Sequence, residues 1–187
     1  MSRQILLCSI AIALLASAAC SKRTTESARA EFASLRDKAE AGNAAAQFDL
    51  GIMYRAGAGV PKDEVEAVKW YRKSAEQGND RAQFNLGFMY ATGDGVPKDA
   101  VEAVKWYRLA AEQGTAAAQS NLGLMYDNGT GVPKDLVQAH MWWNIAGAKG
   151  NEGAKKNLAE VEKQMSSEQK AEATMRAREL FERLPKQ

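Results

Sequence analysis

Residues 46–78 read AQFDLGIMYRAGAGVPKDEVEAVKWYRKSAEQG, and most of this stretch returns twice at intervals of 36 residues. Several glycines, tryptophans and prolines keep the same interval: Gly42, Gly78, Gly114 and Gly150; Trp70, Trp106 and Trp142; Pro61, Pro97 and Pro133. A fixed period of this length is typical of solenoids built from stacked helical units. We therefore expect three repeats, each with two helices, over residues 42–77, 78–113 and 114–149, with the first pair of helices at about residues 44–56 and 64–77.

The glycine-rich stretch RAGAGVPKD at residues 55–63 could in principle hold a phosphate or form a turn. A phosphate loop needs a Gly-Lys-Ser/Thr ending or a GxGxxG pattern after a strand, and neither is present. Lys62 is followed by Asp63, whose carboxylate would repel a phosphate. Pro61 cannot continue a helix, and Asp63 with Glu66 has the spacing of a helix-capping box. The stretch therefore predicts a turn between two helices.

The repeated unit resembles the Sel-one-like repeat (SLR) family, whose members are relatives of the tetratricopeptide repeats. The third copy ends in AHMWWNIAGAKG, a variant often found near the end of such arrays, and the resemblance covers about residues 40–158. It implies an all-α fold, a right-handed α/α solenoid of helix-turn-helix repeats. It also implies an adaptor that binds other proteins.

The two ends of the array have the patterns of capping helices. An apolar stripe precedes the first repeat and another follows the third: Phe32, Leu35 and Ala39; Ala154, Leu158, Val161 and Met165. A capping box at residues 166–169 then opens a last amphipathic helix, whose apolar side carries Ala173, Ala177, Leu180 and Leu184. We expect an N-terminal capping helix over residues 27–41, and a partial fourth repeat with a C-terminal capping helix over residues 150–187. That gives about nine helices in the mature chain.

Residues 1–19 have the layout of a secretory signal peptide. Arg3 is the only charge, an apolar run follows over residues 5–16, and small residues precede Cys20. The apolar run is too short to favour a membrane-spanning helix. Residues 20–26 would then be a linker to the first capping helix.

A cysteine directly after small residues resembles the lipobox of bacterial lipoproteins, which implies a lipid on Cys20. Ser21 after it implies the outer membrane rather than the inner one. Such boxes usually carry Leu or Val where this chain has Ser17, and residues 16–18 also suit ordinary cleavage without a lipid. We expect an exported, outer-membrane-anchored lipoprotein that faces the periplasm and contacts the membrane only through its lipid. The alternative is a soluble periplasmic or secreted protein.

Composition argues against several kinds of partner and site. The formal net charge of +2, with mixed signs, gives no electrostatic case for nucleic acid. Cys8 and Cys20 both fall in or beside the signal, so no disulfide is expected in the mature chain. His140 is the single histidine, which leaves no recognisable zinc spacing and no hydrolase triad. We therefore expect no catalytic residue, no metal and no cofactor.

The three first helices can be compared position by position. Seven positions are identical in every copy, and in the first copy they are Ala46, Gln47, Leu50, Gly51, Met53, Tyr54 and Gly57. At ~100° per residue they share one face of the helix. A glycine at position 51 costs ~1 kcal/mol relative to alanine in mid-helix. We therefore expect a bulky neighbour, Trp70 or Tyr71, to need the space that its missing side chain leaves.

The other face of these helices varies between copies and is the candidate binding surface. By resemblance, the matching positions of tetratricopeptide repeats line a concave groove that holds peptides. Here that groove would carry Phe48, Ile52, Arg55, Phe84, Phe88, Leu124 and Asp127. The alternative is that its aromatic residues pack in the core, as aromatic stripes at helical spacing commonly do.

These patterns predict a non-catalytic adaptor or scaffold of the bacterial cell envelope that binds an unknown protein or peptide on its concave face. One alternative is a cell-wall (peptidoglycan) enzyme or a glycan-binding accessory. The repeated tryptophans could stack on sugars, but their recurrence at the repeat period favours packing. Another alternative is a secreted factor acting on a host, which requires that Cys20 carry no lipid. The sequence leaves open whether the C-terminal helix fills the groove.

Overall fold

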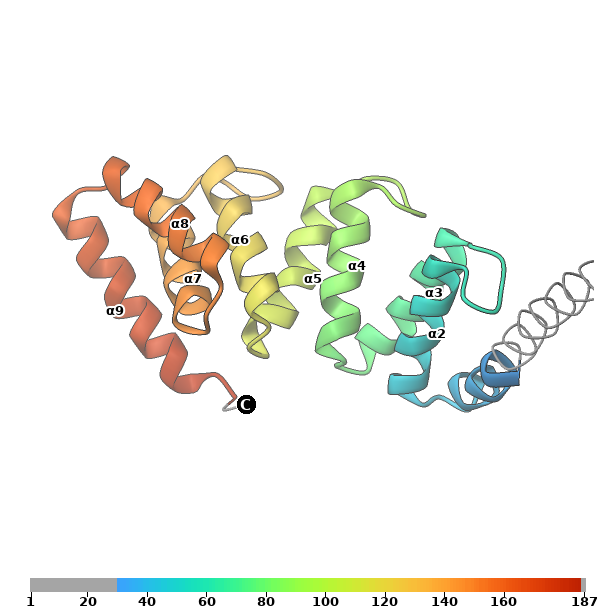
Figure 1. The fold of residues 1–187 in the computed structure, drawn as a ribbon. Helices are drawn as coiled ribbons and strands as arrows, with labels where there is room; N and C mark the ends of the chain where they lie inside the picture. Colours follow the sequence, from blue (N-terminus) through green and yellow to red (C-terminus); the bar gives the residue numbers. More distant parts are fainter. Residues whose placement is uncertain (1–29, 186–187) are drawn as a thin grey trace, which may run out of the picture.

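The computed structural model describes residues 30–185, and this part of the chain is an α/α solenoid without strands (Figure 1). The predicted signal peptide, Cys20, the linker and the first residues of the N-terminal capping helix lie outside it. Residues 30–40 are helical and precede the helices α2 (Ala44–Ala56), α3 (Glu64–Glu76), α4 (Asp80–Thr92), α5 (Ala100–Glu112), α6 (Ala116–Asn128), α7 (Leu136–Ala148), α8 (Glu152–Val161) and α9 (Ser167–Arg183), with the short 3-10 helix η1 (Glu162–Gln164) between the last two. The all-α solenoid of nine α-helices is thereby confirmed for the described residues.

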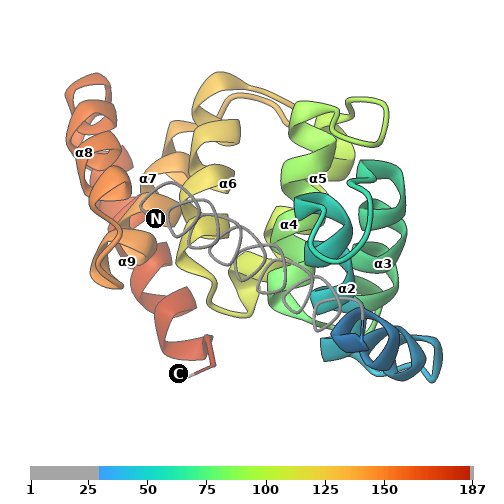
Figure 2. The same cartoon turned by 45° about the vertical axis from the view of Figure 1, so that its right-hand side comes forward.

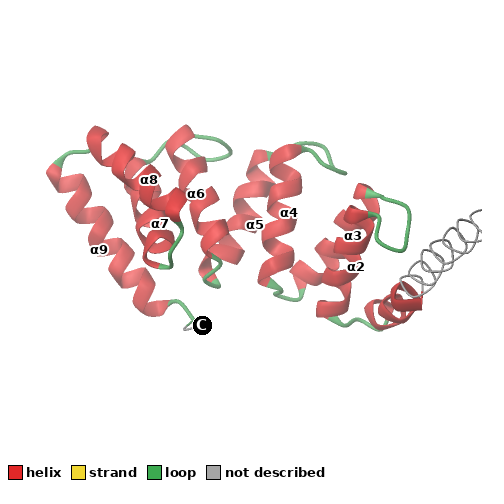
Figure 3. Cartoon of the chain, viewed as in Figure 1, coloured by secondary structure: helices red, strands yellow, loops and turns green. Residues whose placement is uncertain are grey.

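Each repeat is a helical hairpin, and the hairpins stack in chain order. The pairs are α2 with α3, α4 with α5 and α6 with α7, and α3 and α5 also pack against the first helix of the next pair. Loops join the helices at alternating edges of the stack (Figure 3). The turned view keeps the order, from α2 and α3 at one end to α8 and α9 at the other (Figure 2). The solenoid thus places α2, α4 and α6 in order along the stack, each packed against the second helix of its own repeat and, for α4 and α6, that of the preceding repeat.

Glycine against tyrosine sets how closely the two helices of a hairpin approach. A Cβ added at Gly51 would lie 2.7 Å from Cδ1 of Tyr71, and one at Gly87 would lie 2.8 Å from the same atom of Tyr107. In the third repeat, Gly123 meets the indole of Trp143 in the same way. Of the two neighbours predicted for Gly51, Tyr71 is therefore the one in contact.

The glycine-rich stretches are turns, as predicted. Gly57 ends α2 with φ 72°, and its amide donates to the carbonyl of Met53. Asp63 begins α3 by accepting a hydrogen bond from the amide of Glu66 at 3.0 Å. These two caps fix the bounds of the hairpin, because a left-handed glycine ends one helix and an aspartate side chain opens the next.

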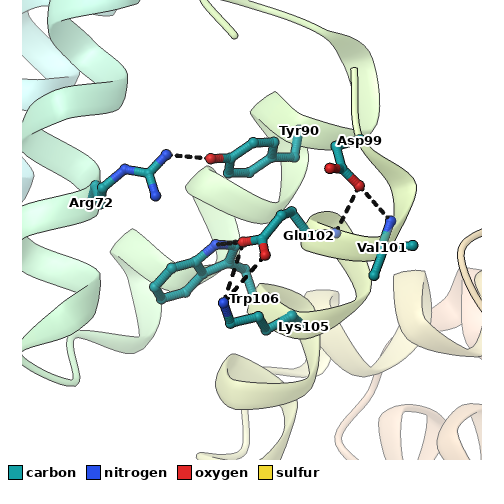
Figure 4. Close-up of polar contacts among 7 residues, drawn as sticks. All are labelled: Arg72, Tyr90, Asp99, Val101, Glu102, Lys105 and Trp106. Carbon is teal, nitrogen blue, oxygen red and sulfur yellow. Dashed lines mark hydrogen bonds and ion pairs between the residues drawn. The ribbon is translucent and has the colours of Figure 1, made fainter. Parts of the chain in front are cut away.

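The second half of the predicted capping boxes is wrong for these turns. Glu102 does not reach back to the backbone of Asp99; it accepts from the Trp106 indole at 3.1 Å and the Lys105 ammonium at 3.2 Å (Figure 4). Glu66 likewise pairs with a lysine one turn along its helix. A charged partner on the same helix is the stronger competitor for a carboxylate. The predicted box at Ser166 and Gln169 does form in full.

The last helix caps the array in an arrangement that the repeat pattern does not give. Instead of pairing with α8, α9 packs along α7. Ala177 of α9, and Leu184 directly after it, are buried in the same core cluster as Met141 and Ile145 of α7. In α3 and α5, the positions that correspond to Met141 and Ile145 are exposed. Lys69 and Lys105 correspond to Met141, and Lys73 and Leu109 correspond to Ile145. The change from lysine to apolar residues marks where α9 covers the solenoid.

Candidate binding groove on the first helices

Two recesses open between successive first helices, and together we call them the groove. The first, of about 540 Å³, is lined by Phe48, Ile52, Arg55, Ala56, Tyr71, Arg81, Phe84, Asn85 and Thr115. The second, of about 270 Å³, is lined by Phe88, Ala91, Thr92, Tyr107, Asn121, Leu124, Met125, Asn128 and Thr130. Many of these residues occupy corresponding positions 36 residues apart, as Tyr71 and Tyr107 do. The stacking of repeats therefore builds a similar hollow twice.

Six of the seven predicted groove residues line these recesses, but at different depths. Phe48 is 4% exposed and packs its ring against Tyr71, with the centroids 5.8 Å apart. Phe84 and Phe88 are partly buried. Ile52 and Leu124 are 38% and 47% exposed, so they present apolar side chains to solvent inside the recesses. The core interpretation thus describes Phe48, whereas the exposed aliphatic residues remain groove candidates.

Asp127 stands apart from the other predicted groove residues. Its carboxylate lies 3.8 Å from the ammonium of Lys134, across the turn between α6 and α7. Its buried Oδ1 accepts no hydrogen bond among the described residues. The structure therefore places this charge at the turn, compensated by a lysine, and outside the residues that line the two recesses.

Two arginines flank the first recess, each lying over an aromatic ring. The Arg55 guanidinium is 5.3 Å from the centroid of Phe88, and that of Arg81 is 4.4 Å from the centroid of Phe48. Such cation–π contacts hold the planar guanidinium groups in place. Neither arginine belongs to an ion pair within residues 30–185.

A tyrosine forms the floor of each recess. Burial raises the pKa of Tyr71, and the positive charge of Arg55 and hydrogen bonds from Arg55 and Asn85 offset part of that rise. Burial raises the pKa of Tyr107 to about 12, against a smaller opposing effect of Asn121. Both phenols therefore stay neutral at physiological pH and act as polar, uncharged groups.

Hydrogen bonds between repeats fix the helices that carry the groove. Arg72 of α3 donates to the hydroxyl of Tyr90 in α4 (Figure 4). Arg108 of α5 donates to the hydroxyl of Tyr126 in α6 in the same way, at 2.6 Å. Beneath them, the buried Gln83 side chain donates to the carbonyl of Ala75 at 3.1 Å. These bonds tie each second helix to the next first helix, so the recesses are built on a tightly connected frame.

Sequence reasoning missed several residues that line the recesses. Arg81 occupies a position where the other copies have Ala45 and Ala117, so no repeated signal points to it. Tyr71 and Asn85 enter the first recess from two different helices, a juxtaposition that only the stacking produces. The recurrence of Tyr71 as Tyr107 was a usable signal, but it pointed equally to core packing.

The residues considered for chemistry have structural roles. His140 is buried, and its Nε2 lies 3.1 Å from Oε1 of Glu162. Trp70, Trp106 and Trp142 are also buried, which confirms the packing interpretation over sugar stacking. Among the described residues, no group of three or more histidine, cysteine or acidic side chains could hold a metal ion. Within the same residues, no helix has the length and apolar character needed to cross a bilayer.

Comparison with known proteins gives a consistent picture of the repeats. The profile of the Sel1 repeat matches residues 44–79, 80–115 and 116–151. Among solved structures, the chain is 37% identical to a protective antigen present in uropathogenic Escherichia coli strains that displays an SLR fold (TM-score 0.75). It is 36% identical to a Sel1 repeat protein from Oxalobacter formigenes (TM-score 0.71).

The alignments cover most of this chain but a smaller share of the matched structures. Each alignment covers 81% of this chain, but 32% of the first structure and 65% of the second. The chain therefore spans less than two thirds of the length of either. No curated protein matches the chain.

Proposed function

The chain belongs to the Sel1 repeat family, whose members are commonly protein-interaction scaffolds, and on that premise we propose that it is a non-catalytic adaptor. In this proposal the groove along α2, α4 and α6 is the concave binding face, and it holds a peptide segment of another protein. The chemistry of the adaptor is recognition alone: apolar anchors enter the recesses, and polar groups at the rims orient the segment.

The observation that carries the proposal is the position of Ile52 and Leu124. They are equivalent residues of the first and third repeats, and both are exposed within the recesses. Exposed aliphatic side chains in a hollow gain most from a partner, because burial stabilises by ~25 cal/mol per Å² of apolar surface. Repetition of the same arrangement suits an extended partner that contacts several repeats in turn.

The proposed location is the cell envelope, with a lipid on Cys20 anchoring the mature chain to the outer membrane and the solenoid in the periplasm. Support comes from the sequence pattern of residues 1–21. Mass spectrometry of the mature N-terminus tests it, with a Cys20→Ala chain as the control. A diacylated or triacylated cysteine is the expected result. Cleavage after Ala18 or Ala19 with no added lipid would instead favour a soluble periplasmic or secreted protein.

The binding proposal is tested by capturing partners on the tagged chain from an envelope extract. The groove variant is Ile52→Lys with Leu124→Lys. The matched control is Val65→Lys with Val101→Lys, because these valines are 53% and 65% exposed but lie on α3 and α5. Each pair places two lysines at exposed apolar positions, so solubility and net charge change alike. We expect partners that remain with the control and are lost with the groove variant.

Two results would contradict the proposal. If both variants capture the same partners, binding uses another surface. If the control loses the partners and the groove variant keeps them, the second helices form the binding face. Circular dichroism of both variants checks that each is still folded.

A further inference from the structure

The two recesses differ in charge although their shapes are related by the repeat. The residues that line the first include Arg55 and Arg81 and no acidic residue. Those that line the second include no charged residue. Alanine stands at the equivalent positions of the following repeat, Ala91 for Arg55 and Ala117 for Arg81. Both positive charges thus line the first recess, and the Arg55 guanidinium also lies over Phe88, which lines the second.

Neither of these two arginines forms an ion pair with a described residue. Three other arginines have carboxylate partners: Arg36 has Glu40, Arg176 has Glu172 and Arg178 has Glu182. Arg72 and Arg108 instead donate to tyrosine hydroxyls of the next repeat. Arg55 and Arg81 have aromatic rings beneath them and no ion pair. A guanidinium already oriented by a ring loses less conformational entropy when it binds a carboxylate. The first recess is therefore prepared for an anion that the described residues do not supply.

The chain's own flanking segments are poor occupants. The sequence of residues 20–29 carries Lys22, Arg23 and Arg29 against a single acid, Glu26, so its charge matches that of the recess. The end of α9 lies in a neighbouring hollow: Phe181 and Leu184 border it beside Gly114 and Lys149, and it shares Thr115 with the first recess. The C-terminal helix therefore does not line either recess of the groove.

We propose that the partner is an acidic peptide segment, with aspartate or glutamate side chains held by Arg55 and Arg81 and apolar side chains on either side of them. This inference rests on the proposed adaptor function and adds the chemistry of the ligand. Carboxylate–guanidinium hydrogen bonds are charge-assisted and can be bidentate, which gives orientation as well as affinity. An apolar side chain lies on Ile52 and Phe84 in the first recess, and the segment continues as apolar residues into the neutral second recess.

The difference in charge between the two recesses also determines which residue types each recess accepts. Near α2 an acidic residue is required, because a basic one would face two cations. Near α6 the recess takes uncharged side chains, because Leu124 is an exposed apolar contact and Asn121 and Asn128 are polar but uncharged. Like-charge contacts disfavour wrong partners more strongly than apolar contacts favour right ones.

A displayed library of random short peptides, each joined to its carrier through its C-terminus, tests the inference without a known partner. The fusion removes free C-terminal carboxylates, so acidic side chains are the one source of anionic groups in the peptide. We expect the full chain to enrich peptides that combine Asp or Glu with neighbouring apolar residues. The Arg55→Gln, Arg81→Gln chain should lose the acidic preference and bind an enriched peptide about tenfold more weakly.

Matched variants separate the possible causes. Arg176→Gln with Arg178→Gln removes the same charge from α9 and should change neither the enrichment nor the affinity. Arg55→Glu with Arg81→Glu should reverse the preference towards Lys and Arg. This reversal cannot arise from partial unfolding, which would weaken all binding alike.

The outcomes distinguish failure of the acidic-partner proposal from failure of the adaptor proposal on which it rests. Enriched peptides without acidic residues, bound equally by the Arg55→Gln, Arg81→Gln chain but lost with Ile52→Lys and Leu124→Lys, would overturn the acidic partner and keep the adaptor. If no enriched peptide depends on Ile52 and Leu124, the proposed function itself fails.

Discussion

The two faces of the first helices differ in what holds their residues in place. On the packing face, Gly51, Gly87 and Gly123 meet Tyr71, Tyr107 and Trp143 so closely that no side chain fits between them. On the groove face, Ile52, Phe88 and Leu124 occupy equivalent positions and vary from copy to copy. Positions that are identical in all three repeats are thus those where helices lie closest together, and positions that vary are the more exposed ones. The same helix carries the frame and the recognition surface.

Adding a side chain to the packing face should have the largest effect on stability. In Gly87→Leu the new Cβ would lie 2.8 Å from the Tyr107 ring, and the core offers it no space. We expect the free energy of unfolding to fall by about 3 kcal/mol or more, measured by thermal and urea unfolding. Gly153→Ala is the control, because a Cβ there meets only a side-chain oxygen of Asn151 at 3.4 Å. A Gly87→Leu chain as stable as the control would contradict the claim that the packing face has no room for a side chain.

Alkaline pH should weaken the packing face through Tyr107. Burial raises its pKa from 10.0 to about 12, so the folded state favours the neutral phenol. Stability from this group is complete below about pH 10 and declines as pH rises towards 12, by about 3 kcal/mol in all. Urea unfolding at a series of pH values should show the loss in the native chain and a shallower one in Tyr107→Phe. Parallel curves for the two chains would show that Tyr107 is not protected.

Replacing the two buried glutamines of the packing face, Gln83 and Gln119, should lower the free energy of unfolding by different amounts. Gln83 donates to Ala75 and also accepts from Gln113, at 2.7 Å, whereas Oε1 of Gln119 is buried and has no hydrogen-bond partner within residues 30–185. Losing satisfied bonds costs more than losing a group that already lacks one. We expect Gln83→Leu to be about 1 kcal/mol more destabilising than Gln119→Leu, measured from urea midpoints. Equal costs would mean that the second bond contributes little.

Substitutions on the groove face should have the smallest effect on stability. Ile52→Lys and Leu124→Lys each replace an exposed side chain, so we expect changes within about 0.5 kcal/mol, while binding of a groove ligand is lost. Calorimetric unfolding alongside the capture experiment measures both. A loss of 2 kcal/mol or more, comparable to a core substitution, would assign these residues to packing instead.

Local signals predicted most of the fold. The glycine and aspartate caps placed α2 at Ala44–Ala56 as observed and α3 within one residue of its observed end. The glycine at position 51 predicted a close ring, because a glycine in mid-helix needs a packing reason. The apolar stripe of the last helix identified Ala173 and Ala177, which are buried. These features depend on residues near one another in sequence or on a single neighbouring helix.

What the sequence could not give depends on how distant segments meet. The stripe of α9 says that one side is buried, but not that it lies along α7 instead of α8. Comparison of Lys69 and Lys105 with Met141 was the available clue, since a solvent position turned apolar. Arg81 joins Arg55 in one recess only through the stacking of α4 on the first repeat. Asp127 lines neither recess, and its carboxylate lies beside Lys134 across the turn.

Site-specific photocrosslinking in living cells tests the central claim most directly. A photoreactive phenylalanine analogue is placed singly at Ile52 or Leu124 in the groove, and at Val65 or Val101 on the second helices. Both pairs are exposed apolar positions, and the second-helix pair is the more exposed, so weaker crosslinking there would not reflect poorer access. The groove account predicts crosslinks to a partner protein from positions 52 and 124 but none from 65 and 101. Crosslinks from 65 and 101 alone would contradict it and move the binding face to the second helices.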